Sequence, residues 1–195
     1  MKNVSTEEVD RLRRLIRYCP DEGRFWWNTR TEADFSAMGR HGVSNKCRAA
    51  NCRKWNAAWA GAECFIQDNG RGYLVGMVTG KNYQAHRLAW ALHYGEWPKG
   101  HIDHINRVRT DNRISNLRLA SPSENRANTT ANGGMYSSLK GVSFHKGNGR
   151  WISSIRFNGR RQHLGYFDTP EAAAEAYKAA SLERHASFSI FAAPA

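Results

Sequence analysis

The stretch from His101 to Thr129 holds Asp, His and Asn side chains at a density that the packing of a core does not require. Two short segments within it are predicted strands: His101 to Ile105, which alternates in polarity, and Leu117 to Leu119. Ser121 with Glu124 three residues later forms a capping box, which opens a short helix. The order strand, loop, strand, helix therefore predicts a small ββα unit that presents polar groups.

The segment before this stretch predicts a hairpin followed by a helix. Tyr73 to Val78 and Tyr83 to Ala85 are the expected arms, and Gly80 lies in the expected turn. Apolar residues then recur at helical spacing from His86 to Tyr94, and Gly95 is a typical helix end. We therefore assign residues 71–128 to one folded core.

The first 70 residues are predicted to extend this core. Residues 6–17 have helical periodicity, and the aromatic run Arg24 to Trp27 is typical of a short strand. From Thr29 to Asn69 the sequence shows no clean period. We expect that region to be ordered, because its large aromatic side chains must pack, but its structure is not predicted.

After the core, residues 129–138 are rich in Thr, Asn, Gly and Ser, which is typical of a linker. Three strands with short turns follow, at Gly141 to His145, Trp151 to Phe157 and Arg161 to Tyr166. Thr169 then opens an alanine-rich helix. The fold class is therefore predicted as α+β, with a small three-stranded antiparallel sheet packed on one helix beside the ββα core.

The charge favours a polyanionic partner. Lys and Arg number 29 against 17 Asp and Glu, which gives a net charge of +12 and a pI near 10. Between Ser137 and Phe167 there are six basic residues and no acidic one. No run reaches the length of a membrane span and no signal-peptide pattern opens the chain, so we expect a cytoplasmic protein without a membrane partner.

The central segment resembles phage-type and intron-associated HNH endonucleases. The resemblance is carried by AHRLAW, GEWPKGHIDHIN, DNRISNLR and SENRAN, between about Tyr73 and Asn128. It implies a ββα-metal (His-Me finger) nuclease core and a host that is bacterial or phage-infected. It also implies cutting of double-stranded DNA to 5′-phosphate and 3′-hydroxyl ends, one strand per active site, with homing as the typical setting.

By this resemblance, four residues form the active site. His104 is the general base, and Asn116 holds its imidazole and the surrounding loop in place. Asp103 and Asn125 bind a divalent metal through their oxygen atoms. Such hard oxygen ligands favour Mg²⁺, and Mn²⁺ is expected to substitute. His86 and His101 are expected only to cap, pack or touch phosphate.

The C-terminal segment resembles the Apetala-2/ethylene-response-factor DNA-binding domain. KGV, GRW, LGYFDT and the helix ending AYKAA carry this resemblance. It implies that the sheet lies in the major groove while the helix packs behind it. The candidate DNA contacts are Lys140, Ser143, His145, Arg150, Ser154, Arg156, Arg161 and His163.

These inferences together predict a modular DNA endonuclease. Its predicted parts are an N-terminal extension (1–70), the nuclease core (71–128), a linker (129–138), the DNA-binding module (139–182) and a tail (183–195). A non-catalytic DNA-binding regulator is the main alternative, and an RNA-directed protein is a third. No obligate protein partner is inferred.

Two further sets of residues in the N-terminal extension remain open. Cys47, Cys52 and Cys64 with His41 are a conceivable zinc set, but the spacing of the first pair is looser than in a zinc knuckle, so buried thiols are the preferred interpretation. A charge argument adds possible contacts to flanking DNA from Arg11, Arg14, Lys46, Arg48, Arg53 and Lys54.

Overall fold

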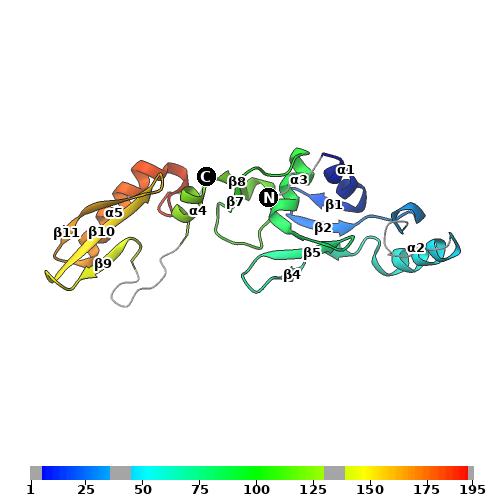
Figure 1. Cartoon of the computed structure of the whole chain (residues 1–195), viewed down its shortest axis with the longest axis horizontal. Helices are drawn as coiled ribbons and strands as arrows, with labels where there is room; N and C mark the ends of the chain where they lie inside the picture. The colour runs from blue at the N-terminus through cyan, green and yellow to red at the C-terminus, as the bar shows by residue number, and fades with distance from the viewer. Residues whose placement is uncertain (1–5, 36–44, 130–138, 193–195) are drawn as a thin grey trace. The chain divides into compact units, whose positions relative to one another are not determined.

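The computed structural model describes residues 6–35, 45–129 and 139–192. It is a mixed α and β protein with small antiparallel sheets (Figure 1). The chain forms two compact units. The N-terminal unit comprises residues 1–104 and 108–118, and the C-terminal unit comprises 105–107 and 119–195.

The N-terminal unit contains three helices and most of the sheets. The helices are α1 (Thr6–Leu15), α2 (Asn45–Trp59) and α3 (Ala85–Tyr94), with 3₁₀ turns η1 (Glu32–Phe35) and η2 (Ile114–Asn116). One sheet has the order β1 (Ile16–Cys19), β2 (Arg24–Trp27), β3 (Glu63–Cys64). The next has the order β4 (Gln67–Asp68), β5 (Leu74–Val78), β6 (Lys81–Gln84). A two-stranded sheet pairs β7 (His101–His104) with β8 (Leu117–Ala120).

Helix α3 lies at the centre of this unit's core. Its Leu88 and Ala89 are fully buried and pack in one cluster with Leu12, Phe25 and other apolar residues of α1 and the sheets. The predicted hairpin before α3 and the helix end at Gly95, which has φ +80°, are confirmed. Helix α3, the β5–β6 hairpin and strand β7 therefore all pack on one apolar core.

The first helix is shorter than predicted. We expected it to run through residue 17, but it ends at Leu15 and Ile16 begins β1, opposite Trp27 of β2. The side-chain amide of Asn28 donates to the carbonyls of Arg13 and Arg14, which satisfies acceptors at the helix end. Ile16 and Arg17 therefore pair with β2, although their spacing in the sequence continues the helical pattern of α1.

Helix α2 was not predicted, and its burial explains why. Cys52 is buried, whereas Arg53 and Lys54 and most other side chains of this helix are half-buried or exposed. A helix without an apolar stripe gives no periodic signal. It is anchored instead by polar contacts: Asn56 accepts from the Arg30 backbone N–H at 2.8 Å and donates to the Arg30 carbonyl at 2.9 Å.

The C-terminal unit is a three-stranded antiparallel sheet with two helices. Strands β9 (Val142–His145), β10 (Arg150–Phe157) and β11 (Arg160–Phe167) follow one another in space, as predicted. Helix α5 (Pro170–His185) packs across all three strands, and η3 (Ala186–Phe188) follows it (Figure 1). Ile155, Leu164, Tyr177 and Ala180 form the core between sheet and helix.

Helix α4 (Pro122–Ala127) packs with α5 and η3 in this unit. A helix of six residues buries little surface alone, so it depends on such neighbours. The division between the compact units therefore runs through β8, whereas the sequence placed it after residue 128. The predicted domain boundaries stay a prediction, and residues 130–138 of the expected linker lie outside the described part of the chain.

Replacement of Gly141 should destabilise the C-terminal unit. Gly141 has φ +75°, and a Cβ there would lie 2.0 Å from Cδ2 of Tyr177. We expect Gly141→Ala to lower the free energy of unfolding by at least about 2 kcal/mol, through backbone strain plus overpacking. Urea denaturation followed by circular dichroism measures this change.

Gly149→Ala is the matched control. Gly149 has φ +66°, but nothing lies within 4 Å of its added Cβ, so only the backbone cost of about 1 kcal/mol is expected. An equal decrease in the free energy of unfolding in the two variants would show that the contact of residue 141 with Tyr177 does not contribute to stability.

Candidate functional site

Strand β7 places two of the predicted active-site residues in buried positions. Asp103 and His104 are only 5% and 4% exposed. Ile102 on the same strand belongs to the core, whereas His101 is exposed. The strand is therefore anchored by its apolar residue, and its end carries an acidic and an imidazole side chain out of bulk water.

The imidazole of His104 lies in an aromatic and amide environment. Its Nε2 is 3.4 Å from Oδ1 of Asn112, and its ring lies 5.3 Å from that of His86 and 6.0 Å from that of Tyr73. Burial lowers the pKa of His104, although the Asn112 contact and nearby carboxylates act in the opposite direction. A neutral imidazole is therefore favoured, and this is the form that can accept a proton.

Asn112 is a site residue that sequence reasoning missed. It is 1% exposed, and besides the contact with His104 its Nδ2 donates to the Thr110 carbonyl at 3.2 Å. The predicted residue, Asn116, donates from Nδ2 to the Asp111 carbonyl at 2.8 Å and so fixes the same loop. The motif DNRISN holds both asparagines, and only the fold shows that the first one meets the imidazole.

The loop between β7 and β8 is also held in place by the hairpin of β1 and β2, which we call the N-terminal hairpin. The Tyr18 hydroxyl donates to the Asn112 carbonyl at 2.7 Å, and the Ile114 N–H donates to the Pro20 carbonyl at 3.0 Å. Gly23, with φ +70°, packs so closely that a Cβ would lie 2.4 Å from the Arg113 nitrogen. The N-terminal extension is thus part of the support of the candidate site.

His86 packs against His104 from α3. It is 6% exposed, its ring lies 5.1 Å from that of Tyr73, and its Nδ1 is buried without a hydrogen-bond partner in the described structure. Burial and the neighbouring His104 lower the pKa of His86 to about 3. Of the three roles expected for His86, the contacts support packing.

The carboxylate of Asp103 is paired with Arg118 on β8. Arg118 Nε donates to Asp103 Oδ2 at 2.9 Å, and Nη2 lies 2.8 Å from the same oxygen. Both side chains are shielded from water, at 6% and 16% exposure. Arg118 was not a predicted site residue, although its position in the motif DNRISNLR is next to the strand that carries the carboxylate.

Asn125 lies on α4 in the C-terminal unit. Its N–H donates to the Ser121 carbonyl at 3.0 Å, within the first turn of the helix. The predicted capping box is present, because Glu124 N–H donates to Ser121 Oγ at 3.2 Å and Ser121 N–H donates to Glu124 Oε2 at 2.7 Å. The local sequence thus fixes the start of the helix that presents Asn125.

One carboxylate and one amide oxygen, from Asp103 and Asn125, are the hard donors that Mg²⁺ and Mn²⁺ accept. In the described residues no cluster of three or more His, Cys, Asp or Glu is placed to hold a metal. Mg²⁺ sites commonly complete their shell with water and phosphate oxygens. Each of the two side chains, taken by itself, is therefore a donor of the kind that a divalent metal accepts.

The strand register brings seven of the eight predicted DNA contacts to one face of the C-terminal sheet. Directly paired residues share a face, and the pairs His145 with Arg150, Ser154 with His163 and Arg156 with Arg161 lie opposite one another. Ser143 pairs with Ile152 on that face. We call this the outer face; it comprises Ser143, His145, Arg150, Ser154, Arg156, Arg161 and His163, while Ile155 points to α5.

Lys140 differs from the other predicted DNA contacts. Its Nζ donates to the carbonyls of Arg126, Ala127 and Thr129 at 2.9, 2.7 and 2.6 Å. These bonds use all three ammonium hydrogens and cap the end of α4. Burial, with a smaller effect of Arg107, lowers the Lys140 pKa to about 8. Lys140 therefore holds a helix end in this structure, and it is not on the outer face.

The remaining candidates lie in the N-terminal unit. Arg11, Arg14, Arg53 and Lys54 are exposed, Arg48 is half-buried, and the side chain of Lys46 lies outside the described residues, as does His41. Cys52 Sγ donates to the Arg30 carbonyl at 3.2 Å, and burial raises the pKa of Cys64 to about 12. These two thiols serve as small core groups. No described helix combines the length and apolar character needed to cross a bilayer.

Comparison with known proteins agrees with the motif. Residues 83–127, which include β7, the loop, β8 and α4, match the HNH endonuclease family. The chain is also 33% identical over 107 residues to Protein 3.8 of Escherichia phage T7, across 54% of this chain and 88% of that protein. The chain therefore belongs to the same family as this phage protein, and its central segment is an HNH endonuclease domain.

Burial of His86 predicts a stability loss in acid. Its pKa is about 3 in the folded protein against 6.5 in the unfolded chain, so between these values the unfolded chain binds more protons. This contribution is complete above pH 6.5, and it is lost as the pH falls, by about 1.4 kcal/mol per pH unit. Denaturant titrations at several pH values measure the slope.

His86→Phe keeps an aromatic ring and removes the titration, so the slope should become shallower by about that amount. The wild-type protein, measured under the same conditions, is the control. An unchanged slope in His86→Phe would contradict the assignment.

Proposed function

We propose that this protein is a divalent-metal-dependent DNA endonuclease in which His104 is the general base. The observation that carries the proposal is the burial of a neutral-favoured imidazole beside the carboxylate of Asp103 at the end of β7, within the HNH domain. Hydrolysis of a phosphodiester needs a base for water and a cation to neutralise the leaving oxygen. His104 and Asp103 supply the base and one ligand for the cation.

In the proposed mechanism His104 accepts a proton from the attacking water. Asn112, at 3.4 Å from Nε2, limits the rotation of the ring, and Asn116 fixes the loop that carries Asn112. Burial keeps competing water away from the imidazole. The contribution of the protein is thus to hold one unprotonated nitrogen in a fixed position.

Asp103 and Asn125 are the proposed metal ligands, with Mg²⁺ as the expected ion and Mn²⁺ as a substitute. The metal, when bound, supplies positive charge that stabilises the leaving 3′-oxygen. Arg118 holds Asp103 Oδ2 by two nitrogen atoms, which orients the carboxylate before any ion arrives. Products with 5′-phosphate and 3′-hydroxyl ends follow from this chemistry.

The outer face of the C-terminal sheet is the proposed DNA-anchoring surface, similar to that of an Apetala-2/ethylene-response-factor domain. Arg156 and Arg161 lie opposite one another on it, and Arg161 Nε donates to Ser154 Oγ at 3.0 Å, which fixes its direction. Arg150 lies on the same face at the other end of β10, where its Nε donates to Asp168 Oδ1 at 3.0 Å. With one catalytic centre per chain, we propose that the enzyme nicks one strand of double-stranded DNA. A homing-type role in the cytoplasm of a bacterial or phage-infected cell is consistent with the phage relative.

A supercoiled plasmid assay tests the nuclease and its base. We expect the wild-type protein to produce open circles with Mg²⁺ and none with EDTA. His104→Ala should reduce nicking by at least about 100-fold, since it removes the base. His101→Ala, on the same strand but exposed, is the control and should retain activity. Equal nicking by His104→Ala and wild type would exclude His104 as the base.

The same assay discriminates the alternative function. A DNA-binding regulator would bind duplex DNA tightly and leave the plasmid supercoiled with every divalent metal tested. Nicking that depends on His104 excludes that alternative.

The outer face predicts a salt-dependent contact. Arg161→Gln should weaken binding to duplex DNA and reduce the slope of log affinity against log salt by about 1, because one phosphate contact is lost. Lys178→Gln removes the same charge from α5, on the other side of the sheet, and should leave the slope unchanged. Fluorescence anisotropy at several salt concentrations gives both slopes, and equal slopes for the two variants would remove the outer face from the proposal.

A further inference from the structure

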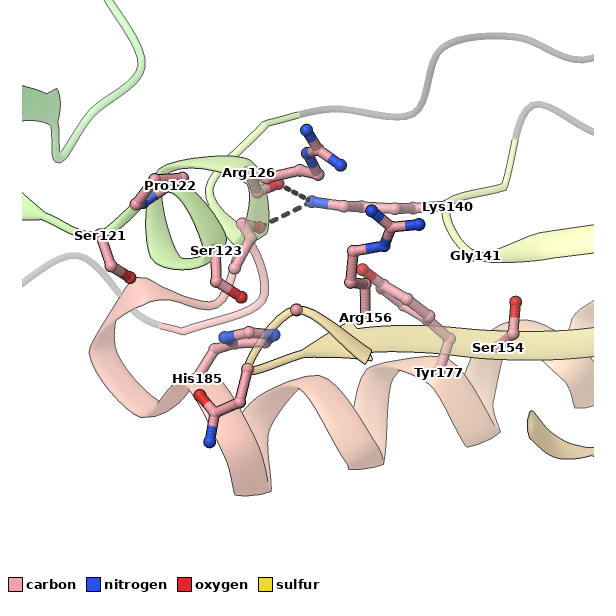
Figure 2. Close-up of a pocket in the computed structure, with 13 residues that line it drawn as sticks. Ser121, Pro122, Ser123, Arg126, Lys140, Gly141, Ser154, Arg156, Tyr177 and His185 are labelled. Carbon is pink, nitrogen blue, oxygen red and sulfur yellow. Dashed lines mark hydrogen bonds between the residues drawn. The ribbon is translucent and has the colours of Figure 1, made fainter. Parts of the chain in front are cut away.

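A pocket of about 550 Å³ lies in the C-terminal unit, next to the second half of β10. Strand β9 pairs with β10 only from Arg150 to Ser153, and beyond this pairing the Ser154 N–H donates to the Gly141 carbonyl at 2.9 Å. Ser154 and Arg156 line the pocket at this end of the shorter strand. Helix α4 forms the opposite wall, and Tyr177 and His185 of α5 line the base (Figure 2). The pocket thus results from the different lengths of two neighbouring strands.

The pocket is positively charged. Its lining includes Arg126, Lys140 and Arg156, and none of its lining residues, all of them in the described part of the chain, is Asp or Glu. Figure 2 shows the side chains of Arg126, Lys140 and Arg156 among the residues that line the pocket. A lining that carries cations and no carboxylate favours a bound anion.

The roles of the three cations differ. Lys140 has given its three hydrogens to backbone carbonyls of and next to α4, so it contributes charge but no donor. Arg126 and Arg156 are exposed, and guanidinium groups can each offer several N–H donors to a phosphate. The donors for an anion are therefore the two arginines, and Lys140 fixes the wall to which Arg126 belongs.

An unpaired hydroxyl also faces the pocket. The Oγ of Ser123 is buried without a hydrogen-bond partner in the described structure, and Figure 2 shows it directed from α4 toward His185. A buried polar group without a partner is energetically unfavourable. A ligand with an acceptor or donor at this point would recover that cost.

The rest of the lining is mixed. Ser121, Ser154, Asn158 and His185 add polar groups, and Ala127 and Tyr177 lie buried in the wall. The exposed ring of Pro122 on α4 provides surface against which a sugar or a base can pack. The size is within the usual range for small-ligand sites. Cations, an unpaired hydroxyl and an exposed apolar ring together match a nucleoside phosphate better than a bare inorganic anion.

We propose that this pocket binds one nucleotide of the DNA strand, with Arg126 and Arg156 on its phosphate and its nucleoside against the exposed ring of Pro122. The inference rests on the proposed function, because it takes DNA as the substrate. Arg126 directly follows Asn125 on α4, so a nucleotide held by Arg126 stabilises the helix that carries the proposed metal ligand. The pocket thus links DNA anchoring to the HNH helix within the C-terminal unit.

Binding is measured in the His104→Ala background with EDTA, so the result does not depend on cleavage. Calorimetry with deoxythymidine 5′-phosphate, thymidine and inorganic phosphate as probes should show the tightest binding for the nucleotide. A short single-stranded oligonucleotide should compete with it. Nucleotide binding that the oligonucleotide does not displace would mean that the pocket takes free nucleotides only, and this outcome overturns the proposal.

Variants identify the residues. Arg126→Gln and Arg156→Gln should each weaken oligonucleotide binding roughly tenfold and lower the salt slope by about 1, whereas Lys178→Gln should change neither. Ser123→Leu keeps every charged side chain and fills part of the pocket. It should abolish nucleotide binding, while the circular dichroism spectrum stays that of the folded protein. Wild-type affinity in Ser123→Leu, or equal effects in Lys178→Gln, would refute the pocket.

The two proposals can fail separately. If the wild-type protein nicks plasmid and the pocket variants bind DNA as it does, the pocket proposal is wrong and the nuclease stands. If no metal supports nicking but the pocket variants lose DNA binding selectively, the nuclease proposal is wrong and the pocket stands as a DNA site.

Discussion

One buried contact in the HNH segment joins Nε2 of His104 to Oδ1 of Asn112, at 3.4 Å. An imidazole removed from water is useful as a base only if its orientation is fixed and its neutral form is favoured. Burial provides the second condition, and the amide of Asn112 provides the first. The loop, the N-terminal hairpin and α3 are all packed around this contact, so much of the N-terminal unit supports the position of one ring.

Electrostatic pairing at Asp103 complements this arrangement. A carboxylate that is 6% exposed requires a partner, and Arg118 supplies it with well-oriented donors. The ion pair therefore holds the carboxylate of Asp103 in one orientation at the end of β7.

Local patterns predicted much of the fold and part of the site. The capping box at Ser121, the helix end at Gly95 and the strand that carries Asp103 and His104 were all evident, because each depends on a few neighbouring residues. Asn112 and the C-terminal packing of α4 were not, because they depend on contacts between distant segments. Lys140 shows the same limit: its sequence neighbours suggest a DNA contact, whereas its ammonium caps a helix.

The hydrogen bond from Tyr18 to the Asn112 carbonyl affects the order in which the chain folds. The two residues are 94 positions apart, so the loop beside His104 closes only against a hairpin that was synthesised much earlier. During translation the hairpin leaves the ribosome first and is already available when the loop follows. An excised HNH segment beginning at residue 71 lacks Tyr18, and the loop that carries Asn112 would have to reach its conformation without this hydrogen bond.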